Sequence, residues 1–229
     1  GKAKGREVSL CGTYISSPLV WACSVGTSSP YDTMEEMVSE ETKSGTEPVK
    51  WGVSRMGSGS HTMGVYASTN MNVPSDNQEF VVADNFQGLR DGANAGKFDA
   101  FLWEHFTSKP YWSDDIKHIG DVPTPWPAFS FVQGKNLAKA TSVTPEDISE
   151  KLFPGIAAGV ELFEKGDSAI IERICKEHKH TDEDARLWLS RTVYATTDAK
   201  SPMAIDKGHY AKSVDIMKSV GLVPNDYAV

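Results

Sequence analysis

The chain has 229 residues, 39% of them hydrophobic and 24% charged, which is typical of a globular protein with one large or two small domains. Its formal net charge of −8 argues against nucleic acid as a partner, and the sequence contains no apolar run long enough to span a membrane. The three cysteines lie far apart without a CxxC pair, which argues against a disulfide framework and favours a reducing, cytoplasmic compartment.

Short β-rich runs alternate with segments of helical spacing along the first 134 residues. The expected strands are residues 8–15, 49–54, 79–83, 98–103 and 128–133, with a weaker candidate at 116–122. The expected helices between them are residues 32–41, 60–68 and 85–95, the last one capped by Asp84. Strand followed by helix, repeated, predicts a parallel α/β layer.

The final third of the chain is predicted to be helical. Thr144 precedes Pro145 as a helix cap, and Thr181 caps another helix with Asp184 three residues later. A last helix over residues 210–220 is expected to end at Gly221.

The stretch "WGVSRMGSGSH", residues 51–61, joins a predicted strand to a predicted helix. Its glycines allow close backbone approach to a ligand, its serines offer hydroxyls, and a helix N-terminus favours anions. We therefore expect Ser54, Ser58, Ser60 and His61 to face an open cleft that holds a polar or anionic ligand. The alternative is an ordinary surface turn in which Ser60 only caps the helix.

A second polar cluster follows the strand predicted at residues 98–103. Trp103 offers a ring for stacking, Glu104 an acceptor and His105 a charge that changes near neutral pH. Because parallel strands end at one edge of a sheet, we expect Glu104 to share a cavity with the serines. Alternatively, Glu104 and His105 simply start a helix. A metal site built from His61, Glu104 and His105 is chemically allowed but less favoured, and the sequence indicates no cofactor.

Four segments, "GTYISSPLVWACSVG", "WGVSRMGSGSHTMG", "FDAFLWEHFTSKPYW" and "IGDVPTPWPAF", resemble in this order the type II periplasmic-binding-protein fold. The resemblance is to its intracellular eukaryotic members and to the binders of aliphatic sulfonates, taurine and thiamine pyrimidine precursors. It implies two α/β lobes joined by two crossing strands. Residues 1–19 would be a remnant of lobe one with the first crossing, 20–123 lobe two, and 124–229 the second crossing with the C-terminal helices of lobe one.

The resemblance also implies a small-molecule site in the cleft between the lobes. The implied ligand contacts are Tyr14, Ser54, Arg55, Gly57, Ser58, Gly59, Ser60, His61, Trp103, Glu104, Thr124 and Trp126. Because the sequence begins just before the first crossing, lobe one is expected to be incomplete. Either a missing N-terminal segment or a second copy in a homo-oligomer would then complete it.

The function most favoured is binding of a small polar or anionic molecule of the sulfonate, carboxylate, phosphate or pyrimidine type. No pair of nucleophile and base is evident, which argues against an enzyme. The alternatives are a non-binding scaffold that keeps the fold and, less favoured, an enzyme similar to the fungal pyrimidine-precursor synthases, whose cysteine-rich motif is missing here.

Overall fold

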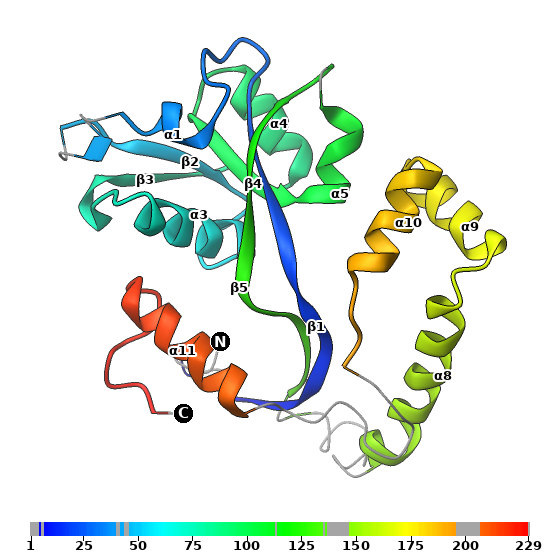
Figure 1. The fold of residues 1–229 in the computed structure, drawn as a ribbon. Helices are drawn as coiled ribbons and strands as arrows, with labels where there is room; N and C mark the ends of the chain where they lie inside the picture. The colour runs from blue at the N-terminus through cyan, green and yellow to red at the C-terminus, as the bar shows by residue number, and fades with distance from the viewer. Residues whose placement is uncertain are drawn as a thin grey trace. The chain divides into compact units, whose positions relative to one another are not determined.

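Two 18-residue strands, β1 (Val8–Val25) and β5 (Lys117–Gly134), each contribute to both compact units of the fold (Figure 1). One unit comprises Gly1–Leu19 with Pro125–Val229, and the other is Val20–Thr124. The structure is a computed structural model that describes residues 5, 7–39, 42–43, 46–112, 114–134, 136, 147–195 and 207–228.

The unit formed by Val20–Thr124 is built on a mixed sheet. The three short strands are β2 (Val49–Val53), β3 (Gln78–Val82) and β4 (Ala100–Glu104), and the strand order is β3-β2-β4-β1-β5. β2 pairs in parallel with both β3 and β4, while β1 pairs with β4 in the antiparallel direction. The parallel layer predicted from the sequence is therefore present, and β1 adds an antiparallel neighbour to it.

Helices cover both faces of the parallel part of this sheet (Figure 1). α3 (Gly59–Asn70) lies on one face and α4 (Phe86–Asn94) on the other, as right-handed crossovers on opposite sides of β2 require. The Trp51 indole Nε1 of β2 donates to Ser68 Oγ of α3 at 2.8 Å, so the largest buried ring in the sheet keeps its polar atom satisfied. On the other face the core consists of Leu89, Ala93, Phe98, Phe101 and Ile116.

The remaining elements of this unit are short. They are α1 (Met34–Met37), η2 (Ser75–Asn77), α5 (His105–Ser108) and η3 (Lys109–Tyr111). The helix predicted at residues 32–41 was therefore too long: Thr33 and Glu36 form a reciprocal capping box, but the helix ends after a single turn. The predicted cap at Asp84 was also wrong, because Asn85 caps α4 and Asp84 has a φ of 62°.

The other unit combines the outer parts of β1 and β5 with helices. These are η4 (Ile148–Leu152), α8 (Phe153–Glu164), α9 (Ser168–His178), α10 (Asp182–Arg191) and α11 (Lys207–Ser219). α9 and α10 pack through Ile171, Ile174 and Ala185. Among the described residues, no helix has the length and apolar character that a membrane crossing needs.

Local signals in the sequence located most of these elements. The predicted cap Thr181 accepts a hydrogen bond from Asp184 N, and Gly221 follows α11 with a φ of 73°. The strands predicted at 116–122 and 128–133 are, however, parts of one strand, β5, and the strand predicted at 8–15 continues to Val25. The predicted cap Thr144 lies outside the described residues.

Candidate functional site

The serine turn, residues 54–60, follows β2 at its carboxyl end and leads into α3. The Ser54 backbone N–H donates to Ser60 Oγ at 3.0 Å, and the Ser58 and Ser60 hydroxyls are 2.9 Å apart. Ser58, not Ser60, is the N-cap of α3, and its Oγ accepts from His61 N at 3.3 Å. All three serines are buried, so the prediction that their hydroxyls face an open cleft was wrong: they bond to one another and hold the turn in shape.

The exposed surface of the serine turn consists of the Arg55 cation, the apolar Met56 side chain and two glycines. Arg55, Gly57 and Gly59 are exposed, and the Arg55 carbonyl accepts from Ser58 N at 3.1 Å, which ties Arg55 to the helix cap. Gly57 has a φ of 78°, a conformation that favours glycine and turns the chain back toward α3. The N-terminus of a 12-residue helix carries a partial positive charge, so Arg55 and the first turn of α3 together make this edge electropositive.

Glu104, at the end of β4, has a structural role at the start of the next helix, α5. It is the N-cap of α5 and accepts from Phe106 N at 3.0 Å and from Thr107 N at 2.7 Å. The Thr107 hydroxyl donates to the same carboxylate at 2.6 Å. Both carboxylate oxygens therefore satisfy the start of α5, as the helix-start interpretation of this residue expects, and a ligand would have to compete with these bonds.

Trp21 connects the two strand ends and was not among the residues predicted from the sequence. It is the β1 partner of Glu104 on β4, and its indole lies edge-on to Trp103 with ring centroids 6.5 Å apart. The same indole lies against Gly59 of the serine turn. Trp103 in turn stacks on Phe86 at 5.4 Å. The sequence predicted the first strand only over residues 8–15, and the antiparallel register that pairs Trp21 with Glu104 is not a local property.

The histidines of this unit do not meet at Glu104. His61 packs edge-on against Phe80 with ring centroids 4.5 Å apart. His105 Nδ1 lies 2.9 Å from Asp121 Oδ1, and His118 Nε2 lies 3.0 Å from the same oxygen. Burial alone would raise the pKa of Asp121, but the hydrogen bonds to the two histidines outweigh it and hold that pKa well below its usual value.

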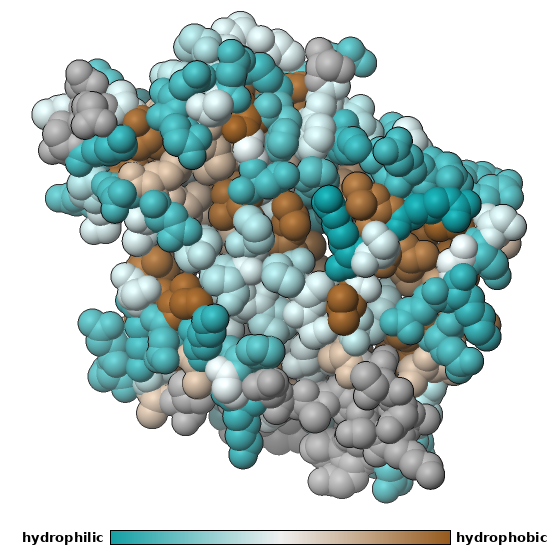
Figure 2. Space-filling view, viewed as in Figure 1, coloured by the Kyte–Doolittle hydropathy of each residue, from teal (hydrophilic) through white to brown (hydrophobic). Residues whose placement is uncertain are grey.

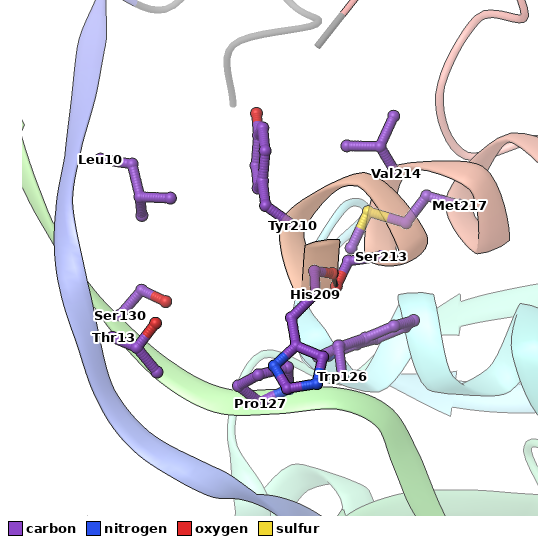
Figure 3. Close-up of a pocket in the computed structure, with 10 residues that line it drawn as sticks. All are labelled: Leu10, Thr13, Trp126, Pro127, Ser130, His209, Tyr210, Ser213, Val214 and Met217. Carbon is purple, nitrogen blue, oxygen red and sulfur yellow. Dashed lines mark hydrogen bonds between the residues drawn. The ribbon is translucent and has the colours of Figure 1, made fainter. Parts of the chain in front are cut away.

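The other unit holds Tyr14 and Trp126. The Tyr14 ring contacts Phe131 and Tyr194 at centroid distances of 5.0 and 5.3 Å, and burial together with Tyr14 raises the pKa of the Tyr194 hydroxyl. Trp126 lines a cavity of about 200 Å³ between α11 and the outer parts of β1 and β5, together with His209 and Met217 (Figure 3). Thr124 is buried at the end of the unit Val20–Thr124.

Apolar side chains are scattered over the surface rather than gathered into one site. On the face shown in Figure 2 several separate groups of hydrophobic residues lie among hydrophilic ones. The exposed large apolar residues are Met56, Val82, Phe129, Val132, Leu152, Leu162 and Val193. Of these, Met56 lies in the serine turn, next to Arg55.

Comparison with known proteins agrees with this architecture. Residues 21–122 match the family model of Ca3427-like PBP, the Ca3427-like periplasmic binding proteins. The Candida albicans CA3427 gene product, which has the generic periplasmic-binding-protein fold, is 28% identical with a TM-score of 0.81, over 98% of this chain and 70% of that one. The search of curated proteins found no match.

Two sulfonate-binding proteins share the fold at lower identity. The periplasmic aliphatic sulphonate binding protein SsuA from Escherichia coli is 12% identical with a TM-score of 0.56, over 97% of this chain and 68% of that one. The alkanesulfonate-binding protein SsuA from Xanthomonas axonopodis, bound to MOPS, is 12% identical with a TM-score of 0.64, over 97% of this chain and 72% of that one. The chain therefore has the periplasmic-binding-protein fold that its sequence motifs predicted, and within that fold it is similar to the Ca3427-like proteins.

Proposed function

We propose that this chain binds a small anionic molecule, with a sulfonate as the first candidate, at the serine turn of the unit Val20–Thr124. The observation that carries the proposal is the electropositive edge formed by Arg55 and the N-terminus of α3 at the exposed Gly59, with the Trp21 indole beside it. In open α/β sheets, ligands bind at the carboxyl ends of the strands, where β2 meets this turn.

The chemistry of this edge suits an oxyanion. A guanidinium offers a planar fork of N–H donors that matches carboxylate, sulfonate or phosphate oxygens, and backbone N–H groups at a helix N-terminus add further donors. The buried bonds among Ser54, Ser58 and Ser60 fix the turn before any ligand arrives, which lowers the entropy cost of binding. The indole of Trp21 provides an apolar wall for the organic part of the ligand.

Three further ligand contacts predicted from the sequence lie on the two long strands and remain predictions. Thr124 and Trp126 lie on β5 and Tyr14 lies on β1, so each belongs to a strand that contributes to both units. The sulfonate is preferred because the relatives SsuA of Escherichia coli and Xanthomonas axonopodis are named as sulfonate-binding proteins.

The test is calorimetric titration with four probes: three small anions, ethanesulfonate, propionate and ethyl phosphate, and the larger sulfonate MOPS. We expect saturable binding of at least one sulfonate by the unmodified chain. Arg55→Gln should weaken it by about tenfold or more, because a hydrogen bond to a charged group is worth about 1.5–3 kcal/mol. Lys97→Gln is the matched control, since Lys97 is also exposed but precedes β4 at the opposite edge of the sheet.

The second candidate is a scaffold that keeps the fold without binding a small molecule. The scaffold is favoured because the predicted ligand contacts already bond within the protein. The Glu104 carboxylate caps α5, and the hydroxyls of Ser58 and Ser60 bond within the serine turn. Absence of heat and of any melting-temperature shift with all four probes would support the scaffold. Equal binding by the Arg55→Gln and unmodified chains would place the ligand elsewhere.

An intracellular setting and self-association also belong to the proposal. All three cysteines are free, and burial, with a smaller contribution from Asp121, raises the pKa of the Cys23 thiol, so this thiol is unreactive and compatible with a reducing compartment. Phe129 and Val132, on the part of β5 in the larger unit, are 52% and 63% exposed and offer an apolar contact to a second copy.

A further inference from the structure

Three metal-ligating side chains converge in the unit Val20–Thr124, away from the bonds that form the serine turn. His105 is the first residue of α5, while His118 and Asp121 lie on β5. Their ligand atoms all lie within 4.8 Å of one another, and this is the one such group of three found among the described residues. We call it the histidine–aspartate cluster.

We propose that the histidine–aspartate cluster binds a divalent transition-metal ion, with Zn²⁺ as the best fit. Two imidazole nitrogens and one carboxylate oxygen form a ligand set typical of zinc, whereas Mg²⁺ and Ca²⁺ prefer sites made of oxygens alone. The proposal is independent of the anion site and departs from the sequence, which indicated no metal.

The distances within the cluster are close to those that a bound ion needs. Asp121 Oδ1 lies 2.9 Å from His105 Nδ1 and 3.0 Å from His118 Nε2. Neighbouring ligands of a tetrahedral zinc ion at about 2.0 Å lie about 3.3 Å apart. The Asp121 oxygen therefore has to draw back from each ring nitrogen by a few tenths of an ångström, and the two ring nitrogens, which lie within 4.8 Å of each other, have to be about 3.3 Å apart. Each histidine also has to carry its proton on the ring nitrogen that faces away from Asp121.

Aromatic packing holds both imidazoles in position before any ion arrives. The His118 ring stacks on Trp112 with centroids 4.1 Å apart and an interplanar angle of 15°. The His105 ring packs edge-on against the same indole at 5.0 Å and against Phe106 at 4.9 Å. Fixed rings reduce the ordering cost of coordination, so the cluster is preorganised for a metal.

The cluster is also reachable from solvent. The side chain of His105 is 11% exposed, that of His118 28% and that of Asp121 36%, so an ion can enter from the side of the aspartate. Three protein ligands leave a fourth position for water or an anion. A bound ion would clamp the start of α5 to β5 and stabilise this unit.

The test is a titration of untagged, EDTA-treated and dialysed protein with Zn²⁺, followed by calorimetry. We expect one strong site per chain, and His118→Gln and Asp121→Asn should each weaken it by more than about tenfold, the lower end of what even an outer-shell partner contributes. The control is a double variant, His178→Gln with His180→Gln, because these two histidines form a pair with rings 5.9 Å apart at the end of α9. This variant should keep the strong site.

Two outcomes would overturn the proposal. One is binding by the unmodified chain that is no tighter than binding by His118→Gln, and the other is loss of the strong site in the His178 and His180 double variant. Circular dichroism and urea melts in EDTA show whether each variant is folded. If Asp121→Asn is unfolded, the His118→Gln variant alone tests the site, since the His118 side chain is more than a quarter exposed and its replacement should leave the fold intact.

Discussion

Gly59 lies against the indole of Trp21, so closely that a Cβ atom at position 59 would be 2.7 Å from Cη2 of that ring. The contact brings the first residue of α3 onto β1, where Trp21 is the partner of Glu104 on β4. Trp21 thus contacts the start of α3 through its ring and pairs with the end of β4 through its backbone.

Replacing Gly59 with alanine should displace the Trp21 ring. We expect a change in tryptophan fluorescence and a loss of about 1–3 kcal/mol in the free energy of unfolding, as for overpacking. The control is Gly159→Ala in α8, where a new Cβ meets nothing within 4 Å and should stabilise the helix by up to about 1 kcal/mol. Unchanged fluorescence and stability of Gly59→Ala would show that the turn does not depend on this contact.

Replacing Ser58 with alanine should destabilise the chain by removing the cap of α3. The hydroxyl accepts from His61 N and also bonds to Ser60 Oγ, so we expect a loss toward the upper end of about 0.5–2 kcal/mol, measured by urea unfolding. Thr69→Ala in the same helix is the control, because the exposed Thr69 hydroxyl bonds only to the Val65 carbonyl one turn earlier. Equal losses in the two variants would contradict the capping role.

Asp99 should make the stability depend on pH in the direction opposite to most carboxylates. Burial, its largest influence, raises the pKa of Asp99 above 3.8 despite the hydrogen bond from Lys50 N at 2.7 Å. A raised folded-state pKa means that its favourable contribution is complete below pH 3.8 and is lost as the pH rises through the folded-state pKa.

Asp99→Asn keeps an acceptor for Lys50 N without a buried charge. We therefore expect this variant to gain stability over the unmodified chain at pH 7, and the gain to vanish as the pH falls below 3.8, in urea melts across this range. The exposed Asp114→Asn serves as the control. If Asp99→Asn is instead less stable than the unmodified chain by the same amount at every pH, the carboxylate is needed for its geometry and its charge is not destabilising.

Self-association through β5 predicts a variant that stays monomeric. If Phe129 and Val132 contact a second copy, Val132→Lys should lower the mass measured by light scattering, because an unpaired charge is costly in an apolar interface. Lys151→Gln, at an exposed position in η4, is the control. If light scattering shows that the unmodified chain is a monomer, the prediction of self-association is wrong.

The sequence alone determined the elements whose signals are local. Alternation and helical spacing located β2, α3, β3 and β4 to within about two residues, and the caps at Thr181 and Gly221 were readable because each bond spans three or four positions. Four short motifs in order were also enough to predict the periplasmic-binding-protein fold. The strand, helix and cap signals depend on neighbouring residues, so they can be recognised without the tertiary structure.

Only the tertiary structure decided which side chains meet. The choice of Ser58 over Ser60 as cap depends on a buried network with Ser54. The place of Trp21 depends on an antiparallel register with Glu104, 83 positions later in the sequence. The histidine–aspartate cluster needs α5 and β5 to lie side by side, which no spacing of 13 or 16 residues reveals. Strand pairing is fixed by burial of whole faces rather than by any local bond, and that is why these contacts appear only once the chain is folded.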